Sequence, residues 1–94
     1  MALARVVTFD GVGRERMAEM QRELREGERP GDIPATEIVV LHDPESEKAL
    51  VVLFFDSEDD YRRADATLDA IPAEETPGRR TSVAKYEVAL RMTG

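Results

Sequence analysis

The most regular hydrophobic pattern in the chain lies between Lys48 and Ile71. Residues 49–55 form an unbroken apolar run, whereas a strand with one solvent-facing side would alternate apolar and polar residues. The run therefore predicts a strand that is buried on both faces. A buried helical segment is the alternative, but the valines and phenylalanines of the run, and the polar residues directly after it, favour a strand.

An amphipathic helix is predicted directly after this strand. Ser57 is a good N-cap residue, and Asp60 three positions later completes a variant of the capping box. Apolar residues then recur at spacings of three and four and form one stripe: Tyr61, Ala64, Leu68 and Ile71. We expect Tyr61 to pack in the core and the helix to end before Pro72.

The remaining elements are recognised from the same periodicities. We expect strands at Leu3–Phe9, Thr36–His42 and Thr81–Met92, and a helix from Arg14 to about Glu26. A polar turn at residues 43–47 joins the second strand to the third. The last strand alternates, and its apolar side consists of Ala84, Tyr86, Val88, Leu90 and Met92. It is therefore predicted to be an edge strand with one wet face.

The predicted order of elements is strand, helix, strand, strand, helix, strand. This split βαβ order predicts a single α+β, ferredoxin-like domain over residues 1–94. Right-handed crossovers place both helices on one face of a four-stranded antiparallel sheet, with the first and third strands in its centre. The helices then leave the second face of the apolar run uncovered. A second copy of the chain is the simplest cover, so we expect a homodimer.

Composition limits the classes of function. The net charge is −7, which argues against nucleic-acid binding because the phosphate backbone requires a basic surface. It argues equally against binding to an anionic membrane. The chain has no cysteine for disulfides or thiolate metal sites, and no apolar run long enough to span a bilayer. We therefore expect a cytoplasmic protein and assign it no cofactor.

Three stretches carry a resemblance to a known family: ARVVTFDG at 4–11, DPESEKALVVLFFDSEDDYRRAD at 43–65 and SVAKYEVALRM at 82–92. Together they resemble the dimeric α/β-barrel superfamily, and more narrowly an uncharacterised branch related to the antibiotic biosynthesis monooxygenases. The resemblance implies a homodimer in which two sheets pack face to face to form a barrel. It also implies a ligand cavity between each sheet and its helices.

The catalytic sets of the characterised relatives cannot be carried over to this chain. The cofactor-free, quinone-forming members rely on Asn and Trp with Tyr, and the haem-degrading members use Asn, Trp and His. This chain contains neither Asn nor Trp. Only the Tyr or His component of those sets remains available.

Three residues stand as weak catalytic candidates. Arg5 is the most unusual, because a charge within an apolar strand needs an ion pair or a cavity. His42 is the only histidine, and a half-exposed place at a strand end is the simpler interpretation than a general base. Tyr86 is more typical of a core residue whose hydroxyl finds a polar partner. The pair Arg79 and Arg80 could hold an anion, although loop arginines are usually solvated.

Two functions follow from these patterns. The first is a homodimeric α/β-barrel protein of unassigned activity, with a small cavity for an apolar or aromatic ligand. The second is a cofactor-independent monooxygenase acting on an aromatic or quinol-type substrate, in which Arg5, His42 or Tyr86 stabilises a substrate anion. A ligand-sensing or partner-binding module is a third class that the residues leave open. A metal site is not expected, because His42 is accompanied only by scattered carboxylates.

Overall fold

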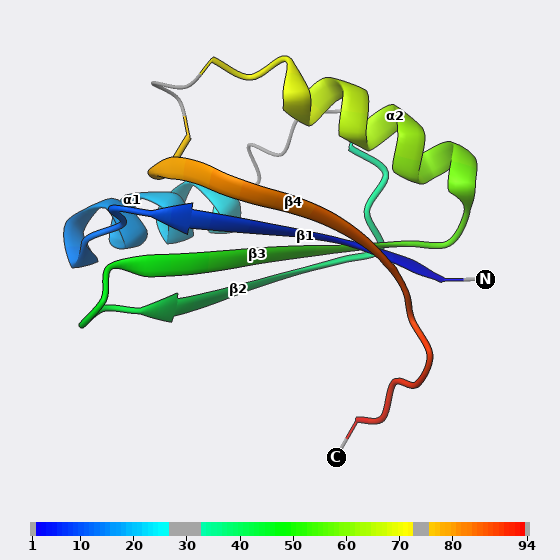
Figure 1. The fold of residues 1–94 in the computed structure, drawn as a ribbon, viewed down its shortest axis with the longest axis horizontal. Coiled ribbons are helices and arrows are strands. Elements are labelled where there is room, and N and C mark those ends of the chain that lie inside the picture. Colours follow the sequence, from blue (N-terminus) through cyan, green and yellow to red (C-terminus); the bar gives the residue numbers. More distant parts are fainter. Residues whose placement is uncertain (1, 27–32, 73–75, 94) are drawn as a thin grey trace.

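The computed structural model describes residues 2–26, 33–72 and 76–93, which contain the elements labelled in Figure 1. In chain order these are β1 (Leu3–Asp10), α1 (Arg14–Arg25), β2 (Glu37–Asp43), β3 (Lys48–Phe55), α2 (Glu58–Asp69) and β4 (Arg79–Glu87). The predicted order of strands and helices is confirmed. The bounds of the first five elements also agree with the prediction to within a few residues.

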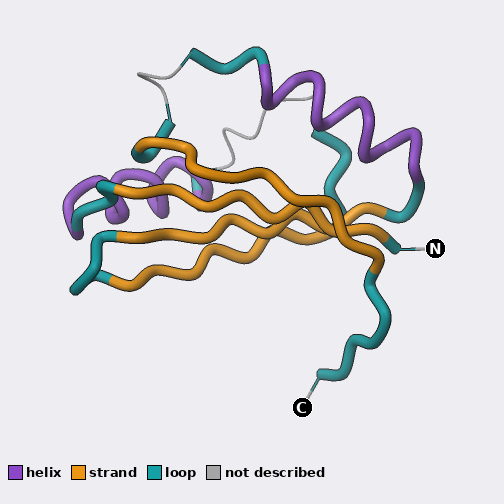
Figure 2. Tube along the Cα trace, in the orientation of Figure 1, coloured by secondary structure: helices purple, strands orange, loops and turns teal. Residues whose placement is uncertain are grey.

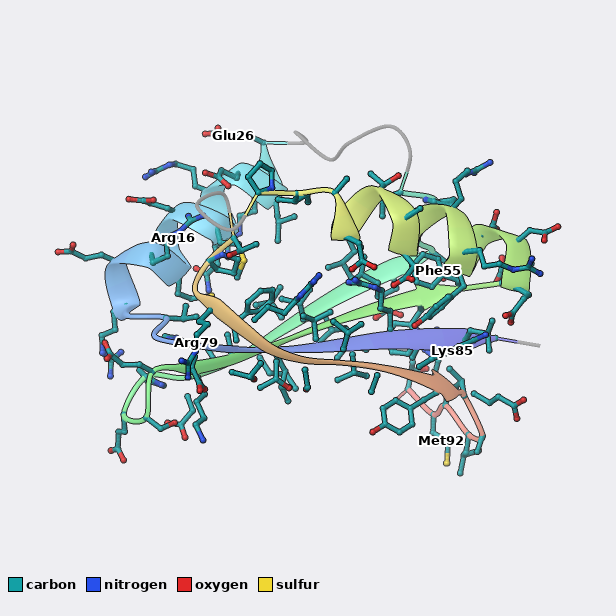
Figure 3. All side chains as sticks on the ribbon, turned by 45° about the horizontal axis from the view of Figure 1, so that its top comes forward. Arg16, Glu26, Phe55, Arg79, Lys85 and Met92 are labelled. Carbon is teal, nitrogen blue, oxygen red and sulfur yellow. The ribbon has the colours of Figure 1, made fainter. Side chains whose placement is uncertain are left out.

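The strands form one antiparallel sheet in the order β2-β3-β1-β4 (Figures 1 and 2). The central strands are β1 and β3, and both helices lie on the same side of the sheet (Figure 3). The α+β, ferredoxin-like arrangement expected from the sequence is therefore confirmed. Residues 43–47 return the chain from β2 to β3, and the Asp43 carboxylate accepts hydrogen bonds from the backbone N–H groups of Glu45 and Ser46.

The second helix begins as the sequence predicts. The Ser57 hydroxyl oxygen accepts a hydrogen bond from the backbone N–H of Asp60 at 3.2 Å, which satisfies one of the donors that a helix leaves free at its first turn. Each of the two helices has 12 residues. In the described part of the chain, neither has the length and hydrophobicity needed to cross a membrane.

The core between sheet and helices divides into two clusters. The cluster beneath α2 consists of Leu3, Ile33, Leu53, Phe55, Tyr61 and Ala64. The cluster beneath α1 consists of Val7, Phe9, Val12, Met17, Met20 and Ala49. Alternate residues of β1 and β3 contribute to both clusters, because they share the face that points toward the helices. The two helices thus cover different parts of one sheet face, and Tyr61 is in the core as expected.

The opposite face of the sheet is mainly apolar and carries no helix. Its apolar side chains come from all four strands: Val6, Val39, Leu41, Leu50, Val52, Phe54, Ala84 and Tyr86. We call this surface the open face. Leu41 and Tyr86 are 51% and 57% exposed, so the described residues leave it in contact with solvent. A contiguous apolar surface of this kind is typical of an interaction site.

The last strand is shorter than predicted, ending at Glu87 instead of Met92. Glu87 pairs with Leu3, the first residue of β1, and the N–H of Val88 then donates to the carbonyl of Ala2 at 2.9 Å. No described strand backbone lies beyond this point to continue the ladder. The prediction was wrong here because apolar alternation alone cannot show where the neighbouring strand begins.

The residues after β4 turn beneath the open face instead of extending the sheet (Figure 1). The Arg91 guanidinium lies 4.3 Å from the centre of the Phe54 ring and pairs with the Glu37 carboxylate. Leu90 and Met92 are largely exposed. One arginine thus holds the C-terminal segment against one edge of the open face, while its apolar side chains remain in solvent.

Candidate functional site

A cavity of about 390 Å³ lies between the sheet and the helices. The central strands provide much of its apolar lining, through Val7, Phe9, Val51 and Leu53. The two helices add apolar side chains that include Met20, Leu24 and Leu68. The volume is at the lower end of the range of roughly 300–1,000 Å³ that small-molecule sites occupy. The cavity is therefore suited to a small ligand with an apolar body.

Arg5 is the buried charge at this cavity. Its side chain is only 3% exposed, because Arg5 occupies a helix-facing position of the central strand β1. Its Nε lies 2.9 Å from Oδ1 of Asp65, and its Nη2 lies 3.3 Å from Oδ1 of Asp69. The two carboxylates are one helical turn apart on α2 and so share a face of the helix. The buried arginine is thereby compensated by carboxylates that remain partly hydrated.

Arg80 is a second arginine in the lining of the cavity. Its Nη1 lies 2.9 Å from Oδ1 of Asp69, the same oxygen that Arg5 approaches. The adjacent Arg79 differs: its side chain is 82% exposed and lies 3.8 Å from the Asp10 carboxylate. In the sequence the two arginines look alike. In the structure Arg80 lines the cavity, whereas Arg79 lies in solvent.

A β-bulge explains why Arg80 faces the cavity. The pairing of β1 with β4 runs regularly to Thr8 and Ser82, and then shifts so that Phe9 lies opposite Arg80 instead of Thr81. Phe9 belongs to the helix-facing side of the sheet, so this one-residue shift turns Arg80 from the open face to the cavity. Bulges are known to re-aim side chains next to functional sites.

The backbone before the bulge approaches β1 closely at Gly78. A Cβ atom at this position would lie 2.3 Å from the carbonyl oxygen of Asp10 and 2.9 Å from a methyl group of Val12. Only glycine fits without moving the segment, so Gly78 helps to fix where β4 begins. The position of Arg80 depends on this contact.

Two further charged residues among those described in the lining, Arg16 and Glu23, come from α1. Arg16 Nη1 lies 3.3 Å from the Glu19 carboxylate, one turn along the same helix. The described part of the cavity lining therefore contains three arginines and one glutamate, in a chain whose net charge is −7. Among these described lining residues, cationic side chains outnumber anionic ones.

Tyr61 packs beside the Arg5 ion pairs, at the start of α2. Its ring makes an edge contact with Phe55 at a centroid distance of 5.5 Å, and the Lys85 ammonium lies 4.9 Å from its centre. Burial raises the pKa of the Tyr61 hydroxyl above its usual value, and the negative charge of Asp65 adds to this effect.

The other two candidate residues lie outside the cavity. His42 Nε2 is 2.8 Å from the carbonyl oxygen of Val12, so the imidazole ties the end of β2 to the segment between β1 and α1. Tyr86 was expected in the core, and this was wrong: it lies on the open face, while Lys85 occupies the helix-facing side of β4. Of Arg5, His42 and Tyr86, only Arg5 lines the cavity.

Comparison with known proteins assigns no role to this site. No protein-family model matches the chain, and a search of curated proteins finds no match either. Within residues 2–26, 33–72 and 76–93, no three His, Cys, Asp or Glu side chains gather closely enough to hold a metal ion.

Burial of Tyr61 predicts a loss of stability at high pH. An unfolded tyrosine ionises at a pKa of about 10, whereas the folded chain keeps the Tyr61 proton to a higher pH. Above pH ~10 the unfolded state binds fewer protons than the folded state, so the free energy of unfolding falls as pH rises. The tyrosinate absorbance of a Tyr86→Phe variant, in which Tyr61 is the sole tyrosine, should show a higher titration midpoint when folded than in denaturant. Equal midpoints would contradict the prediction.

Proposed function

We propose that the chain is a homodimeric α/β-barrel protein that binds a small, largely apolar ligand between its sheet and its helices. The observation that carries the proposal is the 390 Å³ cavity, which is lined mainly by apolar side chains and bordered by a buried arginine. Small-molecule sites typically combine an apolar lining with a few positioned polar groups. This cavity has that composition.

The open face supports the dimer part of the proposal. Val6, Val52 and Val39 form one row of paired residues across three strands, and more apolar side chains surround them. Exposing such a surface to water is unfavourable by roughly 25 cal/mol for each Å² of apolar area. A second copy presents the same surface, so two open faces placed together remove both from water and close the two sheets into a barrel.

Ligand binding is tested by filling the cavity. Leu68 on α2 lines it, whereas Ala66 on the same helix is exposed. Isothermal titration calorimetry with naphthol should give saturable binding to the unmodified protein and to an Ala66→Trp variant. A Leu68→Trp variant should not bind, because the larger side chain occupies the space of the ligand. Binding that survives in a folded Leu68→Trp variant, as judged by circular dichroism, would place the ligand elsewhere.

The dimer is tested by light scattering during gel filtration. We expect a mass twice that of the 10.5 kDa chain. A Val52→Asp variant should elute as a monomer, because it places a charge in the centre of the open face, where pairing would bury it. The control Ala66→Asp adds the same charge to the exposed side of α2 and should leave the dimer intact. A monomeric unmodified protein at micromolar concentration would refute the dimer.

Cofactor-independent oxygenation is a second candidate function, and the position of Arg5 favours it. A guanidinium at an apolar cavity would stabilise the enolate or phenolate anion that must form before such a substrate reacts with oxygen. The reaction balances without a cofactor: anthrone and O₂ give anthraquinone and water, with all electrons supplied by the substrate.

Oxygen uptake with anthrone tests this second candidate. We expect turnover above the rate in free solution, and a loss of roughly a hundredfold in kcat for Arg5→Met, the range found when an anion-stabilising donor is removed. Tyr86→Phe is the control, because Tyr86 lies on the open face and should not affect the rate. Uptake at the free-solution rate, or full activity in Arg5→Met, would exclude the mechanism.

A further inference from the structure

We propose that the ligand of the cavity carries a single carboxylate, and that Arg5 and Arg80 bind it. This proposal rests on the proposed ligand-binding function and specifies the chemical class of the ligand. The body of the ligand is a small aromatic or alicyclic ring system that fills the apolar part of the cavity. Its carboxylate occupies the end of the cavity where the two guanidinium groups meet at Asp69.

Arg5 has hydrogen-bonding capacity left for a ligand. Its Nε and Nη2 are engaged by Asp65 and Asp69, whereas no described residue accepts a hydrogen bond from Nη1. Among the described residues, no fully enclosed side-chain nitrogen or oxygen lacks a partner, and Arg5 is one of the residues that line the cavity. In the proposal, Nη1 is the donor that a ligand engages. A guanidinium carries five N–H donors in a planar fork, and the fork matches the two oxygens of a carboxylate.

The two ion pairs of Arg5 differ in a way that suits exchange with a ligand. The 2.9 Å contact with Asp65 is at the length expected for a strong charged hydrogen bond, and it fixes the guanidinium plane. The 3.3 Å contact with Asp69 is longer, and the Asp69 side chain is 52% exposed. A ligand carboxylate can therefore take the place of Asp69 at Arg5, while Asp69 keeps its 2.9 Å contact with Arg80 and its hydration.

Arg80 supplies a second cation at the same point. It approaches the Asp69 oxygen that Arg5 also approaches, so both guanidinium groups contact one carboxylate oxygen. The β-bulge opposite Phe9 directs Arg80 into this position. An apolar ligand body needs no second arginine, whereas recognition of an anion uses one.

The surroundings favour a monoanion over a phosphate. Asp65 and Asp69 both remain next to the arginines, so each further negative charge on the ligand would be opposed by these two carboxylates. A phosphate monoester near pH 7 carries close to two negative charges, whereas a carboxylate carries one. A carboxylate is therefore opposed less by Asp65 and Asp69 than a phosphate with a second negative charge would be.

The test compares naphthoate with its neutral isostere naphthamide by isothermal titration calorimetry. For the unmodified protein we expect naphthoate to bind roughly tenfold more tightly than naphthamide, because one charge-assisted hydrogen bond contributes enough free energy for a change of this size. Arg5→Met and Arg80→Gln should each reduce this ratio, which compares the two ligands within one variant. Arg79→Gln is the matched control: it removes the same charge from the neighbouring exposed residue and should preserve the ratio.

The outcomes separate the two levels of the proposal. Equal affinity for naphthoate and naphthamide would overturn the carboxylate assignment and leave the ligand cavity standing. Binding of neither compound would overturn both. Arg80 is partly exposed, so Arg80→Gln should fold even if Arg5→Met does not. The role of Arg80, and with it the two-arginine site, would be refuted by an Arg80→Gln variant that keeps the full tenfold ratio of affinities. It would also be refuted if Arg79→Gln lowered that ratio as much as Arg80→Gln does.

Discussion

A β-sheet has two faces, and in this chain two helices cover only one of them. The central strands β1 and β3 are apolar on both faces, so the sheet is driven to bury surface on its helix side and again on its open side. The helix side is covered from within the chain, whereas the described residues leave the open face in solvent apart from the contact of Arg91 with Phe54. This asymmetry is the physical basis of the proposed dimer.

The helix side is itself incompletely filled, and Arg5 lies at the cavity that remains there. A buried guanidinium in the middle of β1 requires anionic partners, and among the described residues α2 provides them, through Asp65 and Asp69. These ion pairs tie α2 to the sheet over one end of β1, while the cluster that includes Met17 and Met20 packs α1 over the other part. The cavity lies between the two helices, and its lining includes Arg5, whose ion pairs attach α2 to the sheet.

The distribution of charge also separates the cavity from the rest of the molecule. The protein as a whole is acidic, yet most of the described charged residues that line the cavity are arginines. Charges next to an apolar cavity act through a lower effective dielectric than charges on the surface. Local cations can therefore favour an anionic group even though the net charge of the protein is negative.

The sequence by itself determined the order of elements, the cap at Ser57, the burial of Tyr61 and the anomaly of Arg5. These features depend on short-range periodicity, on one local hydrogen bond, and on the cost of placing a charge in an apolar strand. Only the tertiary structure decided which partners Arg5 has, because Asp65 and Asp69 are 60 and 64 residues away along the chain.

The tertiary structure likewise decided the three features of β4 that the sequence could not predict. The strand ends at Glu87 because β1 begins at Leu3, and Arg80 lines the cavity because the ladder shifts between Thr8 and Phe9. Tyr86 is exposed on the open face. The sequence could not show this, because the alternation in β4 defines two sides of the strand without showing which side meets the helices. Each outcome depends on the register of a neighbouring strand, which the residues of β4 alone do not encode.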